Sequence, residues 1–554
     1  MTKYWIISCL FLFSFLSCKK SETADATNPA IIPSTYTFSS LTVNGNYNGL
    51  SYYGLNTLPV VKFTFLSSIN SSSIGGNITL KDQAGNAISY TSTLENNDNT
   101  VVVTTSALQP ITKYTLTVNP GLLSKTGNKL QSSVVVNLTT APDDTDKFSR
   151  ISDDDLLTLV QKQTFKYFWE FGHPVSRLAR ERNSSGNTVT TGGSGFGVMA
   201  LITGISRNFI SRAEGLARIR KMVSFLKTAD RFHGAYPHWL DGSTGKVIPF
   251  STKDNGGDLI ETSYLMAGLL TARQYFNGTD ADETTLRSDI NIIYNGVEWN
   301  WYRKNNSDTL YWHWSPTYNW DMNLPITGWN ECLITYVLAA ASSTYAIPKT
   351  VYDTGWAKNG AMKNGNTYYG VQLPLGTAGG GPLFFSQYSF MGINPIGLSD
   401  AYANYETQTK AHTLINYNYC KANPAGNYGY GENCWGLTAS DIQNGYTASS
   451  TTNDVGTIAP TAAISSIAYT PAESMQALRY FYYKLGNKMW GDYGFYDAFT
   501  LKDAWFASST LAIDQGPIVV MIENYRTKLI WNLFMSAPEV KATMKNLGFT
   551  SPNL

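Results

Sequence analysis

The stretch that decides the fold of the larger part of this chain reads Asp254-Asn255-Gly256-Gly257-Asp258-Leu259-Ile260-Glu261-Thr262-Ser263-Tyr264. A glycine-rich turn leads here into apolar residues at helical spacing, which predicts a helix near residues 258–276. Because Asp258 and Glu261 are three residues apart, both should lie on one face at the start of that helix. A second acid, Glu331, accompanies another apolar helix, predicted near residues 328–344. The sequence therefore predicts a helical domain in which several acids are delivered from helix starts.

Helical patterns continue from about residue 150 to the end of the chain. We predict further helices near residues 152–171, 195–205, 211–228, 283–302, 398–419, 473–486 and 516–534. Long loops rich in glycine, asparagine and aromatic residues join them, and a loop as long as 346–397 is uncommon unless it has a function. This combination favours an all-α toroid of paired helices. A helical solenoid is the alternative, but the sequence shows no fixed repeat that would support it.

Residues 34–142 show a different pattern, in which short β-type runs alternate with turns. The runs include residues 61–65, 77–80, 101–104 and 114–118, separated by turn signals at 84–86, 97–99 and 126–128. Evenly spaced strands of this kind predict a small all-β sandwich. Two stretches, 78–86 and 108–116, resemble bacterial Ig-like domains. The region carries no evident chemistry, so a spacer role is favoured over carbohydrate binding.

The first 18 residues are predicted to be an export signal. Lys3 precedes an apolar run too short to span a bilayer, and the segment ends in Leu16-Ser17-Cys18 followed by two lysines. This resembles a bacterial lipoprotein signal in which Cys18 is lipidated, with an ordinary secretory peptide as the alternative. Residues 19–33 are predicted to form a flexible tether. We therefore expect an extracytoplasmic, outer-membrane lipoprotein, anchored to the lipid membrane on the periplasmic or the cell-surface side.

Composition excludes some partners. The 554 residues carry a formal net charge of +1, and only 15% are charged, which argues against nucleic acid as a partner. Aromatic residues make up 13%, a proportion that suits stacking on sugar rings, although aromatic residues are also ordinary core material. We expect a monomer of at least two domains.

The sequence predicts neither a metal site nor a cofactor. The five histidines and the cysteines have no metal-ligand spacing, and no P-loop or dinucleotide fingerprint is present. The glycine-rich segment 192–197 is better explained by tight backbone packing. Apart from Cys9 and Cys18 in the export signal, three cysteines remain, and either Cys420 and Cys434 form a disulfide or all three, with Cys332, are buried thiols.

Hydrolysis of a glycosidic bond requires one protonated carboxyl group and one carboxylate. Asp258, Glu261 and Glu331 are the candidate catalytic residues, because they occupy charge-poor surroundings that raise the pKa of a carboxyl group. Alone, any such acid could equally be a helix cap or a buried structural group. The candidate substrate-binding residues are Asp254, Trp312, Trp314, Trp329, Phe385, Gln387, Tyr388, His412, Glu432, Trp435, Asp497 and Asp514. A structural role is the alternative for His412.

Seven stretches of residues 150–550 resemble the bacterial glucoamylase-like family, several of whose members form glycoside hydrolase family 144, the endo-β-1,2-glucanases. They are YFWEFGHPVSRLARER, TTGGSGFG, DNGGDLIETSYLMAGLL, YWHWSPTYNWDMNLPITGWNECLITYVLAA, FFSQYSFMGINP, GYGENCWGLTASD and LAIDQGPIVVMIENYRT. The resemblance implies an (α/α)6 barrel and hydrolysis of β-1,2-glucan, a polysaccharide or oligosaccharide substrate, with inversion at the anomeric carbon. The family's candidate catalytic acids correspond to Asp254, Asp258 and Glu261 in one motif and to Glu331 in another.

Two positions depart from the family pattern, which has histidine more often at Gln387 and at Ser449. If both positions line the sugar cleft, the preferred substrate or chain end would differ here. Three alternatives therefore stay open: another β-glucan, exo action that releases a disaccharide, or a surface glycan-binding lipoprotein without catalysis. An inverting mechanism predicts carboxyl groups about 6.5–9.5 Å apart, against about 5–5.5 Å for a retaining one.

Overall fold

The structure, a computed structural model, describes residues 34–554. The export signal with Cys18 and the tether at 19–33 lie outside the described residues. Among the residues described, no helix combines the length and the hydropathy that crossing a membrane requires.

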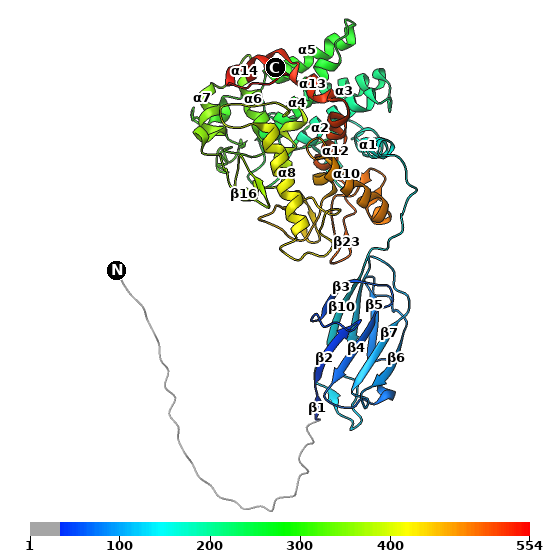
Figure 1. Ribbon diagram of the computed structural model, residues 1–554. Coiled ribbons are helices and arrows are strands. Elements are labelled where there is room, and N and C mark those ends of the chain that lie inside the picture. Colours follow the sequence, from blue (N-terminus) through cyan, green and yellow to red (C-terminus); the bar gives the residue numbers. More distant parts are fainter. Residues whose placement is uncertain (1–33) are drawn as a thin grey trace, which may run out of the picture.

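The N-terminal part is a sandwich of two four-stranded sheets (Figure 1), with the strand orders β2-β4-β7-β6 and β3-β10-β8-β5. The alternation of apolar and polar residues explains it, because in β4 the side chains of Val61, Phe63 and Phe65 are buried while their neighbours face outward. The strands are β1 (Thr35–Tyr36), β2 (Phe38–Val43), β3 (Ser51–Leu55), β4 (Val60–Phe65), β5 (Ile78–Asp82), β6 (Tyr90–Glu95), β7 (Thr100–Thr105), β8 (Lys113–Val118), β9 (Lys129–Leu130) and β10 (Val134–Thr140). The predicted Ig-like sandwich is confirmed.

The C-terminal part is mainly helical, as predicted. Its helices are α1 (Asp153–Trp169), α2 (Thr191–Ser206), α3 (Arg212–Leu226), α4 (Leu259–Tyr275), α5 (Ala281–Asn295), α6 (Leu333–Ala341), α7 (Lys349–Val351), α8 (Tyr405–Ala422), α9 (Pro460–Ile464), α10 (Pro471–Arg479), α11 (Gly486–Met489), α12 (Ala512–Thr527), α13 (Leu529–Met535) and α14 (Pro538–Leu547). One three-stranded sheet and several two-stranded ones accompany them. Their strands are β11 (Thr188–Thr190), β12 (Trp239–Asp241), β13 (Val247–Ile248), β14 (Gly257–Asp258), β15 (His313–Trp314), β16 (Thr367–Tyr368), β17 (Val371–Gln372), β18 (Ala439–Ile442), β19 (Gly445–Ala448), β20 (Trp490–Gly491), β21 (Gly494–Phe495), β22 (Phe499–Thr500) and β23 (Trp505–Phe506).

Helices α2 and α4 pack unusually closely, and glycine makes this possible. A Cβ atom on Gly195 would lie 2.2 Å from the carbonyl oxygen of Tyr264, and one on Gly268 would lie 2.2 Å from that of Gly195. The glycine-rich segment 192–197 is therefore the contact surface of α2, as the sequence predicted. This approach matters for the site, because α4 begins with Asp258 and Glu261.

Several predicted helices have different bounds in the structure, and two of these differences have a clear local cause. The helix predicted at 516–534 is divided into α12 and α13, because Lys528 adopts a left-handed conformation with φ of 62°. The helix predicted at 328–344 begins only at Leu333, so Glu331 lies in the turn before α6. Glu331 therefore precedes the regular backbone hydrogen bonds of α6.

Of the two alternatives for the three remaining cysteines, a disulfide or buried thiols, the structure has the buried thiols. Cys332, Cys420 and Cys434 are buried free thiols, and the Cys420–Cys434 disulfide is not formed. Cys420 and Cys434 belong to one apolar cluster, where they pack as small hydrophobic side chains.

Candidate active site

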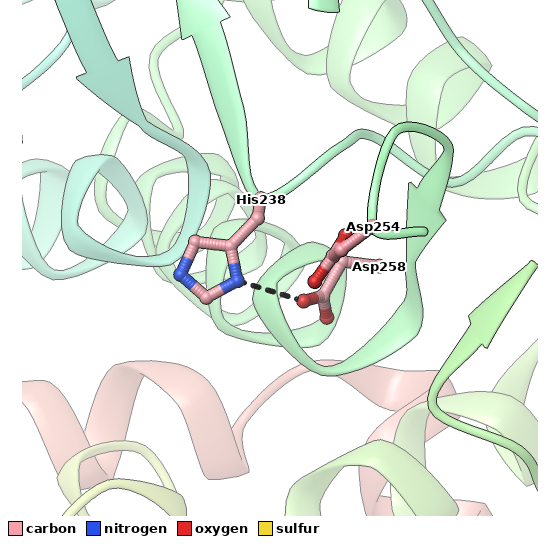
Figure 2. A group of neighbouring side chains, drawn as sticks. All are labelled: His238, Asp254 and Asp258. Atoms are coloured by element: carbon pink, nitrogen blue, oxygen red, sulfur yellow. Dashed lines mark hydrogen bonds and ion pairs between the residues drawn. The ribbon is translucent and has the colours of Figure 1, made fainter. Parts of the chain in front are cut away.

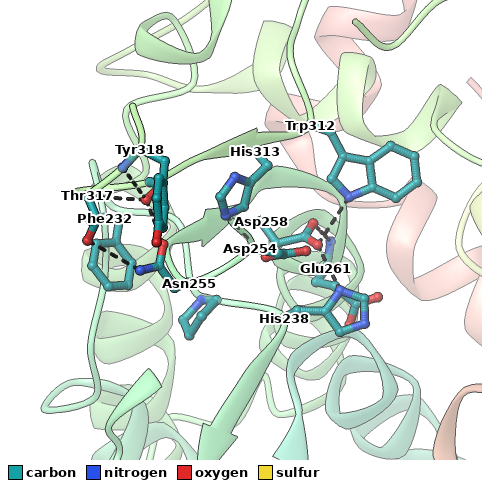
Figure 3. A network of polar contacts seen from close by, with 12 residues as sticks. Phe232, His238, Asp254, Asn255, Asp258, Glu261, Trp312, His313, Thr317 and Tyr318 are labelled. Atoms are coloured by element: carbon teal, nitrogen blue, oxygen red, sulfur yellow. Dashed lines mark hydrogen bonds and ion pairs between the residues drawn. The ribbon is translucent and has the colours of Figure 1, made fainter. Parts of the chain in front are cut away.

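Asp258 caps helix α4 and is held from four directions. Its Oδ1 accepts hydrogen bonds from the backbone N–H groups of Ile260 (3.0 Å) and Glu261 (2.9 Å). Its Oδ2 accepts hydrogen bonds from Nδ1 of His238 (2.9 Å) and from Nε1 of Trp312 (3.1 Å), as Figure 3 shows. The carboxylate is fully buried and well supplied with donors, so Asp258 organises its surroundings.

The short strands β14 and β15 bring the tryptophan motif to this helix start. They pair Gly257 with Trp314 and Asp258 with His313. The backbone N–H of Leu259 then donates to the carbonyl of Trp312 (2.8 Å). The ring of Trp312 is partly exposed and its N–H group is bound to Asp258, which leaves the ring faces as its contact surface.

Glu261 reaches across to the start of helix α2. Its Oε2 accepts hydrogen bonds from the backbone N–H of Gly192 (2.7 Å) and from Oγ1 of Thr190 (3.3 Å). A Cβ atom on Gly192 would lie 2.6 Å from that Oε2, so only glycine allows this contact. Burial raises the pKa of Glu261, and the charge of Asp258 adds to this, while His238 acts in the opposite direction.

His238 is the cation of the site. Burial alone would lower the pKa of its imidazole, but Glu261, Asp258 and Asp254 together raise it to about 9. Phe250 stacks on the imidazole with ring centroids 4.2 Å apart and an interplanar angle of 28°. Since 50% of Phe250 is exposed, this ring covers His238 on one side and is open to solvent on the other.

Asp254 lies beside His238 and Asp258. Its Oδ1 is 3.1 Å from Nε2 of buried His313, although the two atoms lack the alignment of a hydrogen bond. His238, Asp254 and Asp258 place one ligand atom each within 4.8 Å of one another and could in principle hold a metal ion (Figure 2). Because the carboxylate of Asp258 is already hydrogen-bonded to four N–H groups, the arrangement fits a proton network better than a metal site.

The environment of Glu331 is the opposite of that of Asp258, whose carboxylate has several hydrogen-bond donors. Only 6% of it is exposed, and within residues 34–554 its carboxyl group has no hydrogen-bond partner on another residue. Its backbone is held, because Oγ of Ser389 donates to its carbonyl. Burial raises the pKa of Glu331 to about 7, and the charges of Asp258 and Glu261 add to this. A carboxyl group of this kind is still partly protonated at neutral pH, as a general acid must be.

A second carboxyl pair consists of Asp497 and Asp514. Asp497 accepts a hydrogen bond from the backbone N–H of Asp441 (2.6 Å), whose carboxylate is bound by Arg182 (3.1 Å) and by Ser509 (2.5 Å). Burial raises the pKa of Asp497 to about 7 and that of Asp514 well above its ordinary range, and the neighbouring carboxyl group contributes to the shift of Asp514. Asp514 therefore keeps its proton, and Oδ1 of Asp497 and Oδ2 of Asp514 are buried without a hydrogen-bond partner among the described residues.

Tyr388 is close enough to acids of both sets, Glu331 with Glu261 and Asp514, to feel their charges. Its ring stacks on Phe384 (centroids 5.0 Å apart) and meets the edge of Tyr264 (5.7 Å). Burial raises the pKa of Tyr388, and the charges of Asp514 and Glu331 both contribute. Phe385, next in the chain, and Trp314, on β15, are partly exposed.

Four predicted substrate contacts are corrected by their burial. Trp435 is fully buried in an apolar cluster, and Trp329 is only 6% exposed and packs on Phe390, so neither offers a free ring face. His412 is fully buried between Oγ of Ser386 (2.8 Å) and the carbonyl of Gly381 (2.9 Å), and burial lowers its pKa to about 4. The structural alternative for His412 is the correct one.

Gln387 is corrected for the same reason. Its Nε2 donates to the carbonyl of Ala462 (3.0 Å) and to Ser466 (3.1 Å), and only 1% of it is exposed. Glu432 lies instead at the surface, in an ion pair with Lys421 (2.6 Å). It belongs neither to the acids around Asp258 nor to the pair of Asp497 and Asp514. The departure from the family pattern at position 387 therefore concerns the core.

The sequence did not reveal Thr190, Gly192, His238 and Phe250 as parts of the site. Their spacing carries no signal, because they reach Glu261 and Asp258 only through the packing of α2 and of the loop 232–254 against α4. The one available signal for Gly192 was its position in a glycine-rich segment at a helix start.

Comparison with known proteins identifies relatives of both parts of the chain. Residues 323–538 match the family described as "Putative glucoamylase", and residues 51–140 match the bacterial Ig-like domain family. Over 442 residues, 76% of this chain, the sequence is 46% identical to the exo beta-1,2-glucooligosaccharide sophorohydrolase (non-reducing end) of Parabacteroides distasonis. The match spans 60% of that relative's length.

Two solved structures have the same fold. The endo-beta-1,2-glucanase of Chitinophaga pinensis, in complex with sophorotriose and glucose, is 53% identical with a TM-score of 0.71 and covers 73% of this chain and 100% of its own. The beta-1,2-glucanase of Parabacteroides distasonis is 38% identical with a TM-score of 0.70 and covers 94% of this chain and 74% of its own. The chain therefore belongs to the bacterial glucoamylase-like family, and it carries an N-terminal Ig-like domain.

Proposed function

We propose that the protein is a glycoside hydrolase that cleaves β-1,2-glucan. The observation that carries this proposal is the buried, unpartnered carboxyl group of Glu331 beside the network of Glu261, His238 and Asp258. One protonated carboxyl group next to an organised set of acids is what glycosidic hydrolysis needs. The names of the two β-1,2-glucan hydrolases from Parabacteroides and Chitinophaga support the substrate.

In this proposal Glu331 is the general acid and protonates the leaving oxygen. Glu261 is the carboxylate that activates water, since Gly192, Thr190 and the cation of His238 stabilise its negative charge. Asp258 holds His238 and Trp312 in place. The reaction inverts the anomeric carbon, which requires a separation of about 6.5–9.5 Å between the two catalytic carboxyl groups.

Sugar rings are proposed to bind to the partly exposed aromatic rings and to the second carboxyl pair. Trp312, Trp314, Phe385 and Phe250 offer ring faces, and Asp254, Asp497 and Asp514 offer polar atoms. Exo action that releases a disaccharide is the second candidate, because the relative that is 46% identical is an exo enzyme.

We further propose an (α/α)6 toroid for residues 150–550, supported by the succession of helices α1 to α14. We also propose that the protein is a monomer and an outer-membrane lipoprotein. The signal pattern around Cys18 supports the anchor, which the tether at 19–33 separates from the Ig-like domain.

The test is to incubate a soluble form lacking residues 1–18 with linear β-1,2-glucan and, in parallel, with β-1,3-, β-1,4- and α-1,4-glucans. We expect cleavage of the β-1,2 polymer alone and none by Glu331→Gln. Product sizes over time separate endo from exo action. Binding of the polymer without cleavage would instead favour a glycan-binding protein without catalysis.

A further inference from the structure

The hairpin made by β22 and β23 connects the second carboxyl pair to the Ig-like domain. Beyond the paired residues of the two strands, its ladder continues through Ala507 N–H to Ala498 carbonyl (2.9 Å) and Asp497 N–H to Ser509 carbonyl (2.9 Å). The hairpin therefore extends from Asp497 at its base to the turn 501–504 at its tip. In Figure 1 the label β23 lies at the end of the helical domain that faces the Ig-like sandwich.

Three side chains of the Ig-like domain bind the tip. Nζ of Lys113 forms an ion pair with Asp503 (2.7 Å), Nε2 of Gln83 donates to the carbonyl of Asp503 (2.9 Å), and Oγ1 of Thr139 donates to the carbonyl of Lys502 (3.0 Å). Nζ of Lys502 lies in turn over the ring of Tyr53, 5.6 Å from its centroid. All these bonds fall on two consecutive residues of the turn.

Apolar side chains also pack across the interface between the Ig-like domain and the helical domain. Ile111 of the Ig-like domain is 3% exposed and belongs to one apolar cluster with Leu501 and Ala504 of the hairpin. Its φ of 47° is sterically unfavourable for a β-branched residue and persists only where the surroundings impose it. A Cβ atom on Gly54, which has φ of 67°, would lie 2.8 Å from the ring of Tyr428. Two separate backbone positions are thus shaped for this contact.

The base of the hairpin supports the candidate site. Asp497 is bound to the backbone of Asp441, and Ser509, opposite Asp497 in the hairpin, is bound to the carboxylate of Asp441. The charge of Asp497 also raises the pKa of Asp514. A shift of the hairpin would therefore move two of the partners of Asp441, and the charge next to Asp514, together.

We propose that the Ig-like domain fixes the 497–509 hairpin and thereby positions Asp497 and Asp514 for the reaction. Lys113, Gln83 and Thr139 are positioning residues, which touch no substrate and act through the hairpin. The Ig-like domain is then a part of the catalytic unit and more than a spacer. The catalytic part of this inference rests on the proposed function, whereas the mechanical part does not.

The test is the combined variant Gln83→Ala, Lys113→Ala and Thr139→Val in the chain that lacks residues 1–18. We expect the amide hydrogens of Asp497 and Ala507 to exchange about tenfold faster, because three bonds to the hairpin are lost. On β-1,2-glucan we expect kcat to fall about tenfold with a smaller change of KM, since the displaced carboxyl pair orients the bound sugar. Lys113→Arg should retain both wild-type values.

The matched control is Lys62→Ala, which removes another ion pair of the same domain, with Glu95 (2.7 Å), away from the hairpin. This variant should change neither the exchange rate nor kcat. Unchanged exchange in the combined variant would overturn the proposal, and so would faster exchange with unchanged kcat. If the wild type cleaves no glucan while exchange is still faster in the variant, the proposed function fails and the mechanical link stands.

Discussion

Asp258 and Glu331 show how differently two buried carboxyl groups can be treated within one site. Asp258 accepts four hydrogen bonds from N–H donors, whereas Glu331 has no partner on another residue among those described. Donors stabilise a negative charge, and burial without donors disfavours it. The first arrangement suits a residue that orients others, and the second suits a residue that holds a proton for delivery.

The pH dependence of activity should follow Glu331. Because its pKa is raised to about 7, the proton required for acid catalysis is lost as pH rises through 7, so kcat/KM should decline there. The measurement is a pH–rate profile on β-1,2-glucan. A profile that stays flat from pH 6 to pH 9 would exclude Glu331 as the general acid.

The stability of Glu331→Gln follows from the same shift. The folded state binds this proton between the unfolded pKa of about 4.5 and about 7, so ionisation lowers wild-type stability as pH rises across that window. We expect Glu331→Gln to be more stable than the wild type above pH 7, by up to about 3 kcal/mol. Urea unfolding of both proteins at pH 5 and pH 8 checks this, and equal differences at the two pH values would contradict it.

His238 also has a raised pKa, but here the protonated form is the charged one, and it stabilises the fold through its carboxylate neighbours. Its pKa is raised to about 9, so its cation stabilises the fold fully below about pH 6.5, and this contribution is lost as pH rises through 9. We expect His238→Asn to destabilise the protein at pH 6 and much less at pH 10. His233→Asn, at a more exposed His–Glu pair, is the control in the same unfolding measurement.

Phe250 should contribute to binding more than to chemistry. Replacing its half-exposed ring by alanine removes a stacking surface worth about 1 kcal/mol, so KM should rise roughly fivefold with a smaller change of kcat. Phe250→Trp should keep the wild-type KM. An unchanged KM in Phe250→Ala would mean that no sugar ring stacks there.

At the scale of helices and strands, the sequence predicted what local patterns determine. Alternation in residues 61–65 and 114–118 predicted strands, and the glycine-rich segment 192–197 predicted close packing. It did not predict that Trp435 is a core residue, because an aromatic residue in a glycine-rich loop looks the same whether distant helices cover it or not. The bond from Gly192 to Glu261 was equally invisible, since it exists only where α2 meets α4.

The approach of α2 to α4 gives a prediction for the elements. Gly195→Ala would place a methyl group 2.2 Å from the carbonyl oxygen of Tyr264, so α2 and α4 must separate, at a cost of about 3 kcal/mol or more. Thermal unfolding measures this loss. Gly431→Ala is the control, because a Cβ atom there meets nothing within 4 Å. Equal melting temperatures for the two variants would contradict the close packing.

At the scale of the whole molecule, the proposed anchor can be tested separately from the chemistry. Cys18→Ser removes the thiol that lipidation requires, so the protein should move from the detergent-extracted membrane fraction to the soluble extracytoplasmic fraction in the cell. Its activity on β-1,2-glucan should be unchanged. Cys434→Ser, at a buried free thiol, serves as the control and should leave the distribution as it is.

The left-handed backbone of Ile111 has a consequence for protein engineering and for evolution. An Ig-like domain taken from another protein could reproduce the sandwich and still lack a residue of this conformation beneath Leu501 and Ala504. In chimeras made by joining domains at the linker after residue 142, the two domains should therefore fold without forming this interface. We expect the interface residues of the two domains to coevolve, so that neither domain can be exchanged without loss of the contact.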